Sequence, residues 1–453
     1  MLLAGVLALS GSTSLSGCAR ELQAPNVVLI VIDTLRRDHV GFHGHDPETS
    51  PTLDALAAES LVVEDASANA PWTKPAVGTI FTSLMPAKHR AIHESPKSGL
   101  ADELLTLAEV FRRAGYRTGG FVENPNVHRT TGFAQGFEVF RNHGFWTRTK
   151  RATIEGAIDW LEAKDEGQAE PRPFFLFLHF LDPHTPYFAP ARLRERFTLG
   201  HQAENAWARE GRVSEILMNM DPTELTPEDV AMLKALYDAE IRWVDVQVGA
   251  LLRHLEAQGL RDDTVLLVTS DHGEEFLENG RLAHGPWLSA ELLRIPLLLH
   301  VPGLGARRVD HTGVSQLDIA PTLLELAALS VPPAFEGESF AGLARGEASQ
   351  ERSVRAETHN AGTHLRSVRE GGWKLVRDER AGTRRLYDLA SDPAEDWDLA
   401  VANPERVAQL ESQLEPVTAE GPTPPPDAAG PVDEALEQGL RALGYLQQSP
   451  DEK

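Results

Sequence analysis

Acidic and histidine residues stand at the ends of apolar runs along this chain. Asp33 follows the run at 27–32, and Asp271 follows the run at 265–270 and leads directly into His272. In open α/β sheets the ligand crevice lies outside the carboxyl ends of the strands. A carboxylate there either binds a metal ion or caps the next helix, and for Asp33 alone the cap is the commoner role. The Asp271–His272 pair favours a metal, because carboxylate and imidazole together suit Zn²⁺, Mn²⁺ or a similar ion.

A hydroxyl group with a possible role as nucleophile belongs to Thr73. It stands just ahead of a helix predicted at 76–84, where backbone N–H groups and the positive helix end favour an anion. A hydroxyl bound to a divalent metal can lose its proton near neutral pH and attack an ester. The alternative is a threonine that only caps the helix. Lys74 and Arg36 would add positive charge to such a pocket, or else be solvated surface cations.

Two further segments contribute histidines. The stretch 177–187 carries Asp182 and His184 at another predicted strand end, and His284 follows later in the chain. Each histidine taken alone is more often structural than a ligand. Five such features in one chain, most of them at strand ends, together predict a metal-dependent active site. Asn124 is a weaker candidate for substrate contact, since asparagine is common in turns.

Strand-like and helix-like patterns alternate through the first 330 residues. Unbroken apolar, β-branched runs fit strands that are buried on both faces of a parallel sheet. Such runs lie at 27–32, 174–180, 265–269 and 297–301. Helical patterns lie at 51–60, 76–84, 104–114, 154–163, 227–258 and 317–328. The alternation predicts an α/β fold with a mostly parallel central sheet and helices on both faces.

The pattern changes after residue 330. Short strand-like pieces separated by Gly and charged turns lie at 353–357, 363–369, 373–377 and 385–388. They predict a small antiparallel subdomain at 331–402, following a catalytic core at 22–330. The remainder, 403–453, contains a helix, a Pro-rich stretch at 421–431 typical of a stiff linker, and an amphipathic helix at 432–446. This last helix is expected to dock back on the body or to mediate contacts.

The single cysteine, Cys18, ends an apolar and then small-residue segment of 18 residues. That order is typical of an export signal, and Leu15-Ser16-Gly17-Cys18 resembles a bacterial lipobox, although no Lys or Arg precedes the apolar run. The prediction is a bacterial periplasmic or cell-surface lipoprotein, attached to the membrane only through Cys18. The alternative is a frayed N-terminus with a stray cysteine.

The overall charge restricts the partners. The chain has 43 Lys and Arg against 67 Asp and Glu, a formal net charge of −24. This balance argues against nucleic acid and anionic membrane surfaces as electrostatic partners. An anionic ester substrate would have to be attracted by local features such as metal ions.

Four segments together resemble the sulfatase family of the alkaline phosphatase superfamily. They are residues 31–38, 70–75, 182–187 and 269–274. Residues 372–375 and 386–393 resemble the C-terminal subdomain of that family, so the resemblance covers roughly 25–400. It implies an α/β hydrolase of anionic esters that needs one or two divalent ions (Zn²⁺, Mn²⁺, Ca²⁺ or Mg²⁺).

The chain departs from that family at the nucleophile. Sulfatases carry Cys or Ser, oxidised to formylglycine, in a C/S-x-P-x-R motif. Here Thr73 holds the position, Pro75 matches, and Val77 replaces the arginine. Threonine cannot be converted by that route. A threonine nucleophile, an Asp–His pair and a downstream histidine resemble the phosphate-handling branches, such as nucleotide phosphodiesterases and phosphoglycerol transferases.

The resulting hypothesis is cleavage of phosphate or phosphonate esters through a covalent Thr73 intermediate. In it, one divalent ion is bound by Asp33, Thr73, Asp271 and His272. The side chains of Asp182, His184 and His284 hold a second ion or bind substrate oxygens and the leaving group. The alternatives are a sulfuric ester hydrolase, a transferase of phospho-headgroups onto envelope lipids or glycans, and an inactive metal-binding protein.

Overall fold

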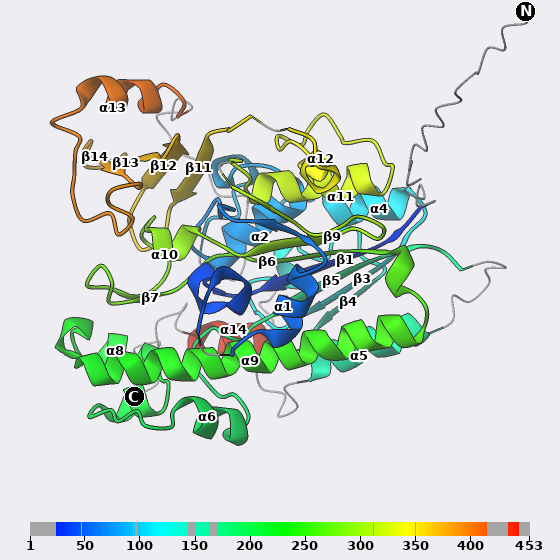
Figure 1. Cartoon of the computed structure of the whole chain (residues 1–453), viewed down its shortest axis with the longest axis horizontal. Coiled ribbons are helices and arrows are strands. Elements are labelled where there is room, and N and C mark those ends of the chain that lie inside the picture. Colours follow the sequence, from blue (N-terminus) through cyan, green and yellow to red (C-terminus); the bar gives the residue numbers. More distant parts are fainter. Residues whose placement is uncertain are drawn as a thin grey trace, which may run out of the picture.

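The computed structural model describes residues 24–46, 48–93, 95, 98–143, 151–163, 171–310, 312–348, 350–414 and 434–443. Within these residues an eight-stranded sheet has the order β10-β2-β9-β6-β1-β5-β3-β4 (Figure 1). Strand β9 pairs antiparallel with β2 and β6, and the other pairs are parallel. The predicted α/β fold with a mostly parallel sheet is therefore confirmed. The predicted signal segment at 1–18 and the Pro-rich linker lie outside the described residues.

The strands of this sheet are β1 (Asn26–Ile32), β2 (Leu61–Val63), β3 (Arg117–Val122), β4 (Val139–Asn142), β5 (Phe174–Phe180), β6 (Thr264–Ser270), β9 (Leu297–His300) and β10 (Arg307–Val309). A two-stranded ribbon consists of β7 (Glu275–Phe276) and β8 (Leu282–Ala283).

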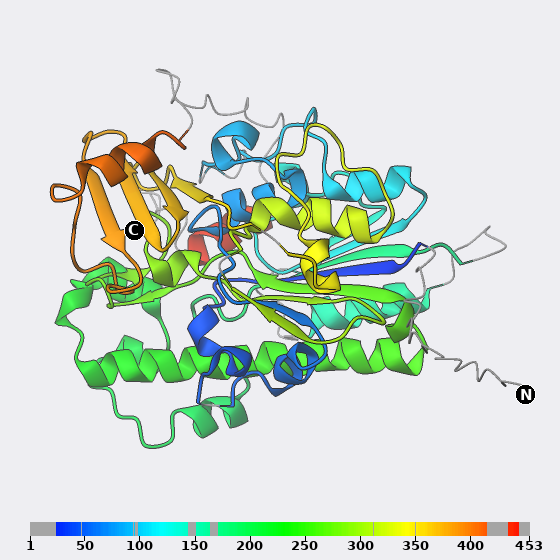
Figure 2. The same ribbon diagram turned by 45° about the horizontal axis from the view of Figure 1, so that its top comes forward.

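Side chains of β1 alternate between two apolar layers, as the two-residue period of a strand requires. Val27, Leu29 and Val31 pack into one core, which also contains residues of three helices: α2 (Thr73–Thr82), α4 (Leu107–Arg113) and α11 (Ile319–Leu326). The intervening residues of β1 pack into a second core with α1 (Pro51–Ala57), α5 (Ala152–Glu162) and α9 (Pro227–Ala257). Both faces of the sheet are thus covered by helices (Figures 1 and 2).

The longest helix, α9, has 31 residues and runs along one face of the sheet (Figure 1). Thr226 caps its N-terminus by accepting the backbone N–H of Asp229, whose carboxylate accepts the N–H of Thr226 in return. Pro227 at the first position fits, because that residue needs no N–H donor. The predicted helix at 227–258 is confirmed almost to its ends.

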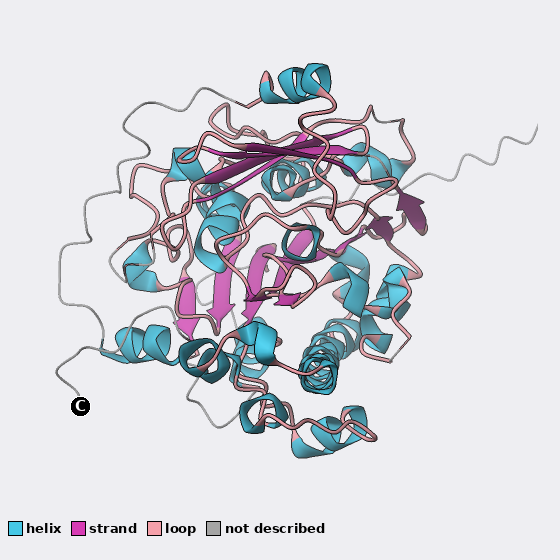
Figure 3. Cartoon of the chain, turned by 90° about the vertical axis from the view of Figure 1, so that its left-hand side faces the viewer, coloured by secondary structure: helices cyan, strands magenta, loops and turns pink. Residues whose placement is uncertain are grey.

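A separate antiparallel sheet stands beside the central one (Figure 3). It consists of β11 (Val354–Thr358), β12 (Leu365–Glu370), β13 (Trp373–Asp378) and β14 (Arg384–Asp388). Helix α13 (Pro404–Glu411) covers it, and Val368, Leu375 and Leu410 lie in the core between them. The predicted C-terminal antiparallel sheet is confirmed.

The final described helix, α14 (Glu434–Ala442), packs against the body of the protein, which is one of the two roles predicted for it. Leu436 and Leu440 are buried, and a Cβ atom at Gly439 would lie 3.3 Å from the ring of Pro125. The remaining helices are α3 (Pro86–His89), α6 (Ala191–Phe197), α7 (Ala206–Arg209), α8 (Val213–Asn219), α10 (Ala290–Leu293) and α12 (Ala341–Arg345). In the part of the chain that is described, no helix combines the length and apolarity needed to cross a membrane.

One predicted boundary that concerns the site is wrong. Helix α2 begins at Thr73 rather than at residue 76, and Trp72 occupies the N-cap without a side-chain hydrogen bond. Thr73 therefore does not cap the helix. It is the first helical residue, and its hydroxyl group is directed to other partners.

Candidate active site

Three parallel strands bring the candidate ligands to one edge of the sheet. In the register of the sheet, Ile32 at the end of β1 pairs with both Phe180 of β5 and Ser270 of β6. Asp33 and Asp271, which follow β1 and β6, therefore leave the sheet side by side. The backbone N–H of Thr34 donates to Asp271 Oδ1 at 3.0 Å and joins the two strand ends. The predicted placement of these two carboxylates at neighbouring strand ends is confirmed, and their binding of a metal ion stays a prediction.

A third side chain completes the group. His179, the penultimate residue of β5, places Nε2 3.7 Å from Asp271 Oδ2. One ligand atom each from Asp33, His179 and Asp271 all lie within 4.8 Å of one another. Sequence reasoning selected Asp182 from this segment, and the ligand group found among the described residues does not include it.

The ligand atoms are buried and unpaired. Asp33 Oδ1, Asp271 Oδ2 and both ring nitrogens of His179 have no hydrogen-bond partner among the described residues, and all three side chains are fully buried. Buried polar atoms in folded proteins are nearly always paired. Unpaired oxygens and an imidazole that face one another fit a divalent cation, for which they are suitable donors.

The electrostatics of the group agree with this interpretation. Burial and the neighbouring Asp271 carboxylate raise the pKa of Asp33 well above its usual value. Two carboxylates in a water-excluded pocket repel each other, and a bound cation would offset that repulsion. Burial lowers the pKa of His272 to about 4, so its imidazole is neutral at pH 7 and has a lone pair for a ligand.

The candidate nucleophile lies next to these ligands. His272 Nδ1 is 2.8 Å from the carbonyl oxygen of Gly273, to which a neutral ring donates its proton. Nε2 then carries the lone pair, and it lies 3.6 Å from Asp271 Oδ2 and 3.7 Å from Asp33 Oδ1. The same nitrogen lies 3.5 Å from Thr73 Oγ1. The structure therefore brings together the four residues predicted to share one ion.

Asn124 links the nucleophile to a ligand. Its amide Nδ2 donates to Asp33 Oδ2 and, at 3.3 Å, to Thr73 Oγ1. The backbone N–H of Asn126 donates to Asn124 Oδ1 at 2.7 Å, which fixes the direction of the amide. The predicted contact with substrate stays a prediction, and the observed contacts join Asn124 to both Asp33 and Thr73.

Two more imidazoles lie beside His272. The ring centroid of His284 is 4.4 Å from that of His272, and the ring of His184 follows at 5.0 Å from His284. His284 Nδ1 lies 2.9 Å from Glu274 Oε1, a buried carboxylate that orients the ring. Burial, with a smaller contribution from His284, lowers the pKa of His184 to about 4. His284 thus lies beside His272, and His184 lies beside His284; the predicted roles of both stay predictions.

The two predicted cations bind protein groups. The Lys74 ammonium donates to the carbonyl oxygens of His93 and Ser95 at 2.8 and 2.9 Å. The Arg36 guanidinium bonds the Asp38 and Glu278 carboxylates. Substrate contact by Lys74 or Arg36 stays a prediction.

A buried tyrosine holds the segment after β1, residues 34–36, which we call the β1 exit loop. Tyr237 of α9 donates its hydroxyl to the carbonyl oxygen of Thr34 at 2.6 Å and accepts the N–H of Arg36 at 2.8 Å. Ser270 Oγ accepts the N–H of Leu35 at 2.9 Å. Sequence reasoning missed Tyr237, because nothing in a helical pattern shows which partner a buried hydroxyl meets.

Comparison with known proteins shows the family of the chain. Residues 25–329 match the Sulfatase family model. The chain belongs to the sulfatase family. Residues 284–420 match the model of the N-sulphoglucosamine sulphohydrolase C-terminal region, which covers the small antiparallel sheet.

Curated relatives of this sulfatase-family chain include a sulfatase of Formosa agariphila, 25% identical over 83% of each chain. Another is a choline-sulfatase of Rhizobium meliloti, 26% identical over 83% of this chain and 82% of the relative. Among solved structures, the phosphonate monoester hydrolase of Agrobacterium radiobacter has a TM-score of 0.71 at 22% identity, over 89% of this chain and 100% of the other. A 2-O GAG sulfatase has a TM-score of 0.69 at 21% identity, over 86% and 90%. This sulfatase-family chain is therefore a hydrolase by family, while the solved structures establish its fold alone.

Proposed function

We propose that the chain is a metal-dependent hydrolase of phosphate or phosphonate esters, with Thr73 as nucleophile. The observation that carries the proposal is the position of Thr73 Oγ1, 3.5 Å from His272 Nε2. That nitrogen lies in turn 3.7 Å from Asp33 Oδ1 and 3.6 Å from Asp271 Oδ2, two oxygens without a hydrogen-bond partner among the described residues. A threonine whose only role was to stabilise its helix would not need its hydroxyl group beside a candidate metal ligand.

The residues that would hold the ion are Asp33, His179, Asp271 and His272. A divalent cation at this position lowers the pKa of a coordinated hydroxyl and polarises the ester. Asn124 supports the arrangement from the other side, because its N–H group bonds both the Asp33 carboxylate and the Thr73 oxygen.

In the proposed reaction, Thr73 Oγ gives up its proton to solvent and attacks phosphorus in line with the leaving group. A new Oγ–P bond forms while the ester P–O bond breaks, and the leaving oxygen takes up a proton from solvent. Water then attacks the phosphorus of the phosphothreonine, the Oγ–P bond breaks, and a proton of that water returns to Thr73 Oγ as phosphate or phosphonate is released. In this proposal His284, whose ring bonds Glu274 and lies beside His272, binds substrate oxygens together with His184.

The chemistry of threonine supports phosphorus over sulfur as the reacting centre. Formylglycine formation oxidises a primary side-chain carbon, and the Cβ of Thr73 carries a methyl group instead. To release an ester formed on threonine, water must attack the phosphorus or sulfur atom of that ester. Phosphoryl groups permit this attack by in-line displacement. The fold does not decide between substrates, because sulfatases and a phosphonate monoester hydrolase both resemble it.

The test compares four substrates: p-nitrophenyl phosphate, bis(p-nitrophenyl) phosphate, p-nitrophenyl phenylphosphonate and p-nitrophenyl sulfate. Thr73→Ala should lower kcat by about 10³-fold or more, as expected for a nucleophile. Thr82→Ala is the matched control, because it removes a buried hydroxyl of the same helix that donates to the Gly78 carbonyl oxygen. Acid-quenched wild-type protein should carry one phosphoryl group on the peptide that contains Thr73. Wild-type rates in Thr73→Ala would remove the nucleophile, and sulfate turnover above all phosphorus substrates would reverse the substrate preference.

A further inference from the structure

A second cluster of metal-type donors lies outside the candidate active site. His39 Nδ1 is 2.7 Å from Asp238 Oδ1, and His45 Nε2 is 3.0 Å from Asp238 Oδ2. The ring centroids of the two histidines are 4.7 Å apart. One ligand atom from each of the three residues lies within 4.8 Å of the other two.

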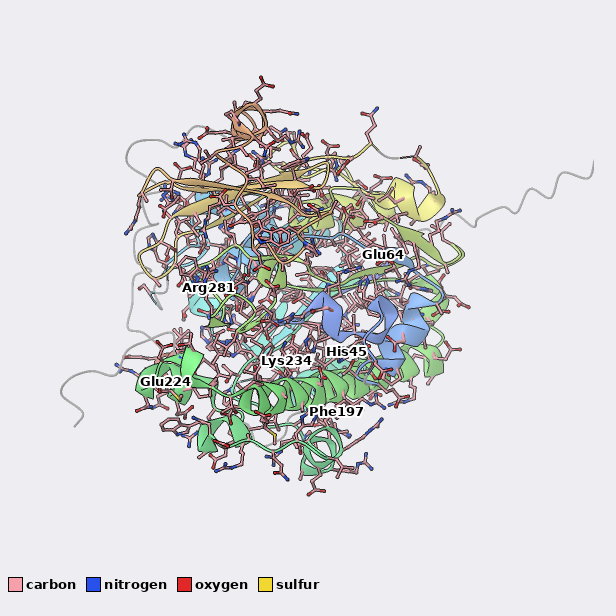
Figure 4. The ribbon with its side chains drawn as sticks, turned by 60° about the vertical axis from the view of Figure 1, so that its left-hand side comes forward. His45, Glu64, Phe197, Glu224, Lys234 and Arg281 are labelled. Carbon is pink, nitrogen blue, oxygen red and sulfur yellow. The ribbon has the colours of Figure 1, made fainter. Side chains whose placement is uncertain are left out.

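The three residues come from different parts of the chain. His39 ends a 3-10 turn, η1 (Arg37–His39), His45 follows six residues later, and Asp238 is on the inner face of α9. In Figure 4, His45 lies beside α9, on the side of the N-terminal segments. The carbonyl oxygen of His39 accepts the hydroxyl of Thr49 at 2.7 Å, which holds the backbone of the first histidine.

The donors carry a negative charge that a cation would neutralise. Burial disfavours the charged form of Asp238, yet hydrogen bonds from His39 and His45 lower its pKa, so it is ionised at neutral pH. Two imidazoles and one carboxylate form a donor set suited to Zn²⁺, whereas Mg²⁺ and Ca²⁺ prefer all-oxygen sites. A tetrahedral zinc ion separates its donors by about 3.3 Å. The two contacts with the Asp238 carboxylate, at 2.7 and 3.0 Å, are close to that separation.

The cluster is accessible from one side. His39 and Asp238 are buried, whereas the His45 side chain is 16% exposed. Three protein ligands leave the fourth tetrahedral position to water on that side. The His45 side chain is therefore the side of the cluster that meets solvent.

We propose that His39, His45 and Asp238 form a zinc site that is distinct from the candidate catalytic centre. Its position suggests what zinc does there. Tyr237, the neighbour of Asp238 on α9, holds the β1 exit loop through two hydrogen bonds, and that loop follows Asp33. Zinc at the cluster ties α9 to η1 and so fixes the helix from which Tyr237 reaches the active-site edge.

The experiment counts zinc in the full chain after loading with Zn²⁺ and gel filtration. Asp33→Asn/Asp271→Asn removes the carboxylates of the candidate catalytic centre, and we expect one zinc per chain to remain. Adding His45→Ala to that background should reduce the content to none, and His201→Ala, an exposed histidine elsewhere, should leave it at one. The wild type should lose one ion on His45→Ala, and Mg²⁺ or Ca²⁺ should not replace it.

The result that overturns the proposal is a folded Asp33→Asn/Asp271→Asn protein, judged by circular dichroism and elution volume, that retains no zinc at micromolar concentration. Equal zinc content in the wild type and His45→Ala would overturn it as well, and this comparison does not require the double variant to fold. Either result would mean that the cluster only stabilises the fold through its hydrogen bonds. Neither bears on Thr73, so failure of this proposal is distinguishable from failure of the proposed function.

Discussion

A buried ion pair inside the C-terminal subdomain, whose lysine also bonds a carbonyl oxygen of the catalytic core, should be costly to break. Lys374 of β13 donates its ammonium to both carboxylate oxygens of Glu395, at 2.6 and 2.7 Å, and to the carbonyl oxygen of Leu288. The two side chains are only 4% and 7% exposed. Lys374→Met keeps the apolar stem but leaves a buried carboxylate and a carbonyl group without a donor. Breaking a buried pair in this way costs about 3–5 kcal/mol.

The free energy of unfolding in urea, followed by circular dichroism and tryptophan fluorescence, measures this cost. Lys374→Met/Glu395→Leu removes both charges and should recover all but about 1–2 kcal/mol, because an apolar pair of similar volume often replaces a buried ion pair without loss. Arg345→Met breaks a half-exposed pair with Glu325 and should change stability by no more than about 1 kcal/mol. The reasoning is refuted if Lys374→Met behaves like Arg345→Met, or if the double variant is as unstable as the single one.

Three further outcomes are expected. Asn124→Ala removes the amide that donates to both the Asp33 carboxylate and the Thr73 hydroxyl. The change should lower metal affinity or kcat by about 10–100-fold, measured by metal titration and steady-state kinetics. Unchanged metal affinity and kcat would exclude a positioning role for Asn124. Tyr237→Phe leaves two backbone groups of the β1 exit loop without their hydrogen-bond partner, and should lower the free energy of unfolding in urea by about 1–3 kcal/mol. A loss below about 0.5 kcal/mol would show that the Tyr237 hydroxyl does not stabilise the loop. Burial lowers the pKa of His89 to about 3. Its unfolded form takes up a proton near pH 6.5 and its folded form does not, so stability falls as pH drops below 6.5, by about 2 kcal/mol at pH 5. A His89→Gln variant should show a smaller drop in melting temperature between pH 7 and pH 5, and an equal drop would assign the acid sensitivity elsewhere.

The central strands could be predicted because their residues are apolar on both faces. Strand β3 could not, since its centre is Gly119-Gly120, a pair that is typical of turns. The structure shows why these glycines stand in a strand. A Cβ atom at Gly119 would lie 2.9 Å from the Trp160 ring, and one at Gly120 would lie 2.7 Å from Phe140. Close packing against aromatic rings is a tertiary effect, and a local pattern does not contain it.

The candidate site was predictable to the extent that strand ends locate it. Asp33 and Asp271 follow strands directly, so their place was readable from the sequence. His179 was missed because it is the sixth residue of β5, within the strand, and only the register with Val31 shows that it reaches the same edge. Its signal was present, since it is the one polar residue in a run of phenylalanine and leucine. The sequence did not show where the Lys74 and Arg36 side chains point, because their partners include groups in loops distant in sequence.

The position of β1 in the sheet affects how the protein is made. This strand is complete at residue 32, yet its two neighbours in the sheet are residues 174–180 and 264–270. At translation rates of about 5–20 residues per second, the nascent chain exposes an unpaired apolar strand for roughly ten seconds or more before β6 emerges. An apolar strand that waits this long for its partners is a segment that a holding chaperone can bind during synthesis.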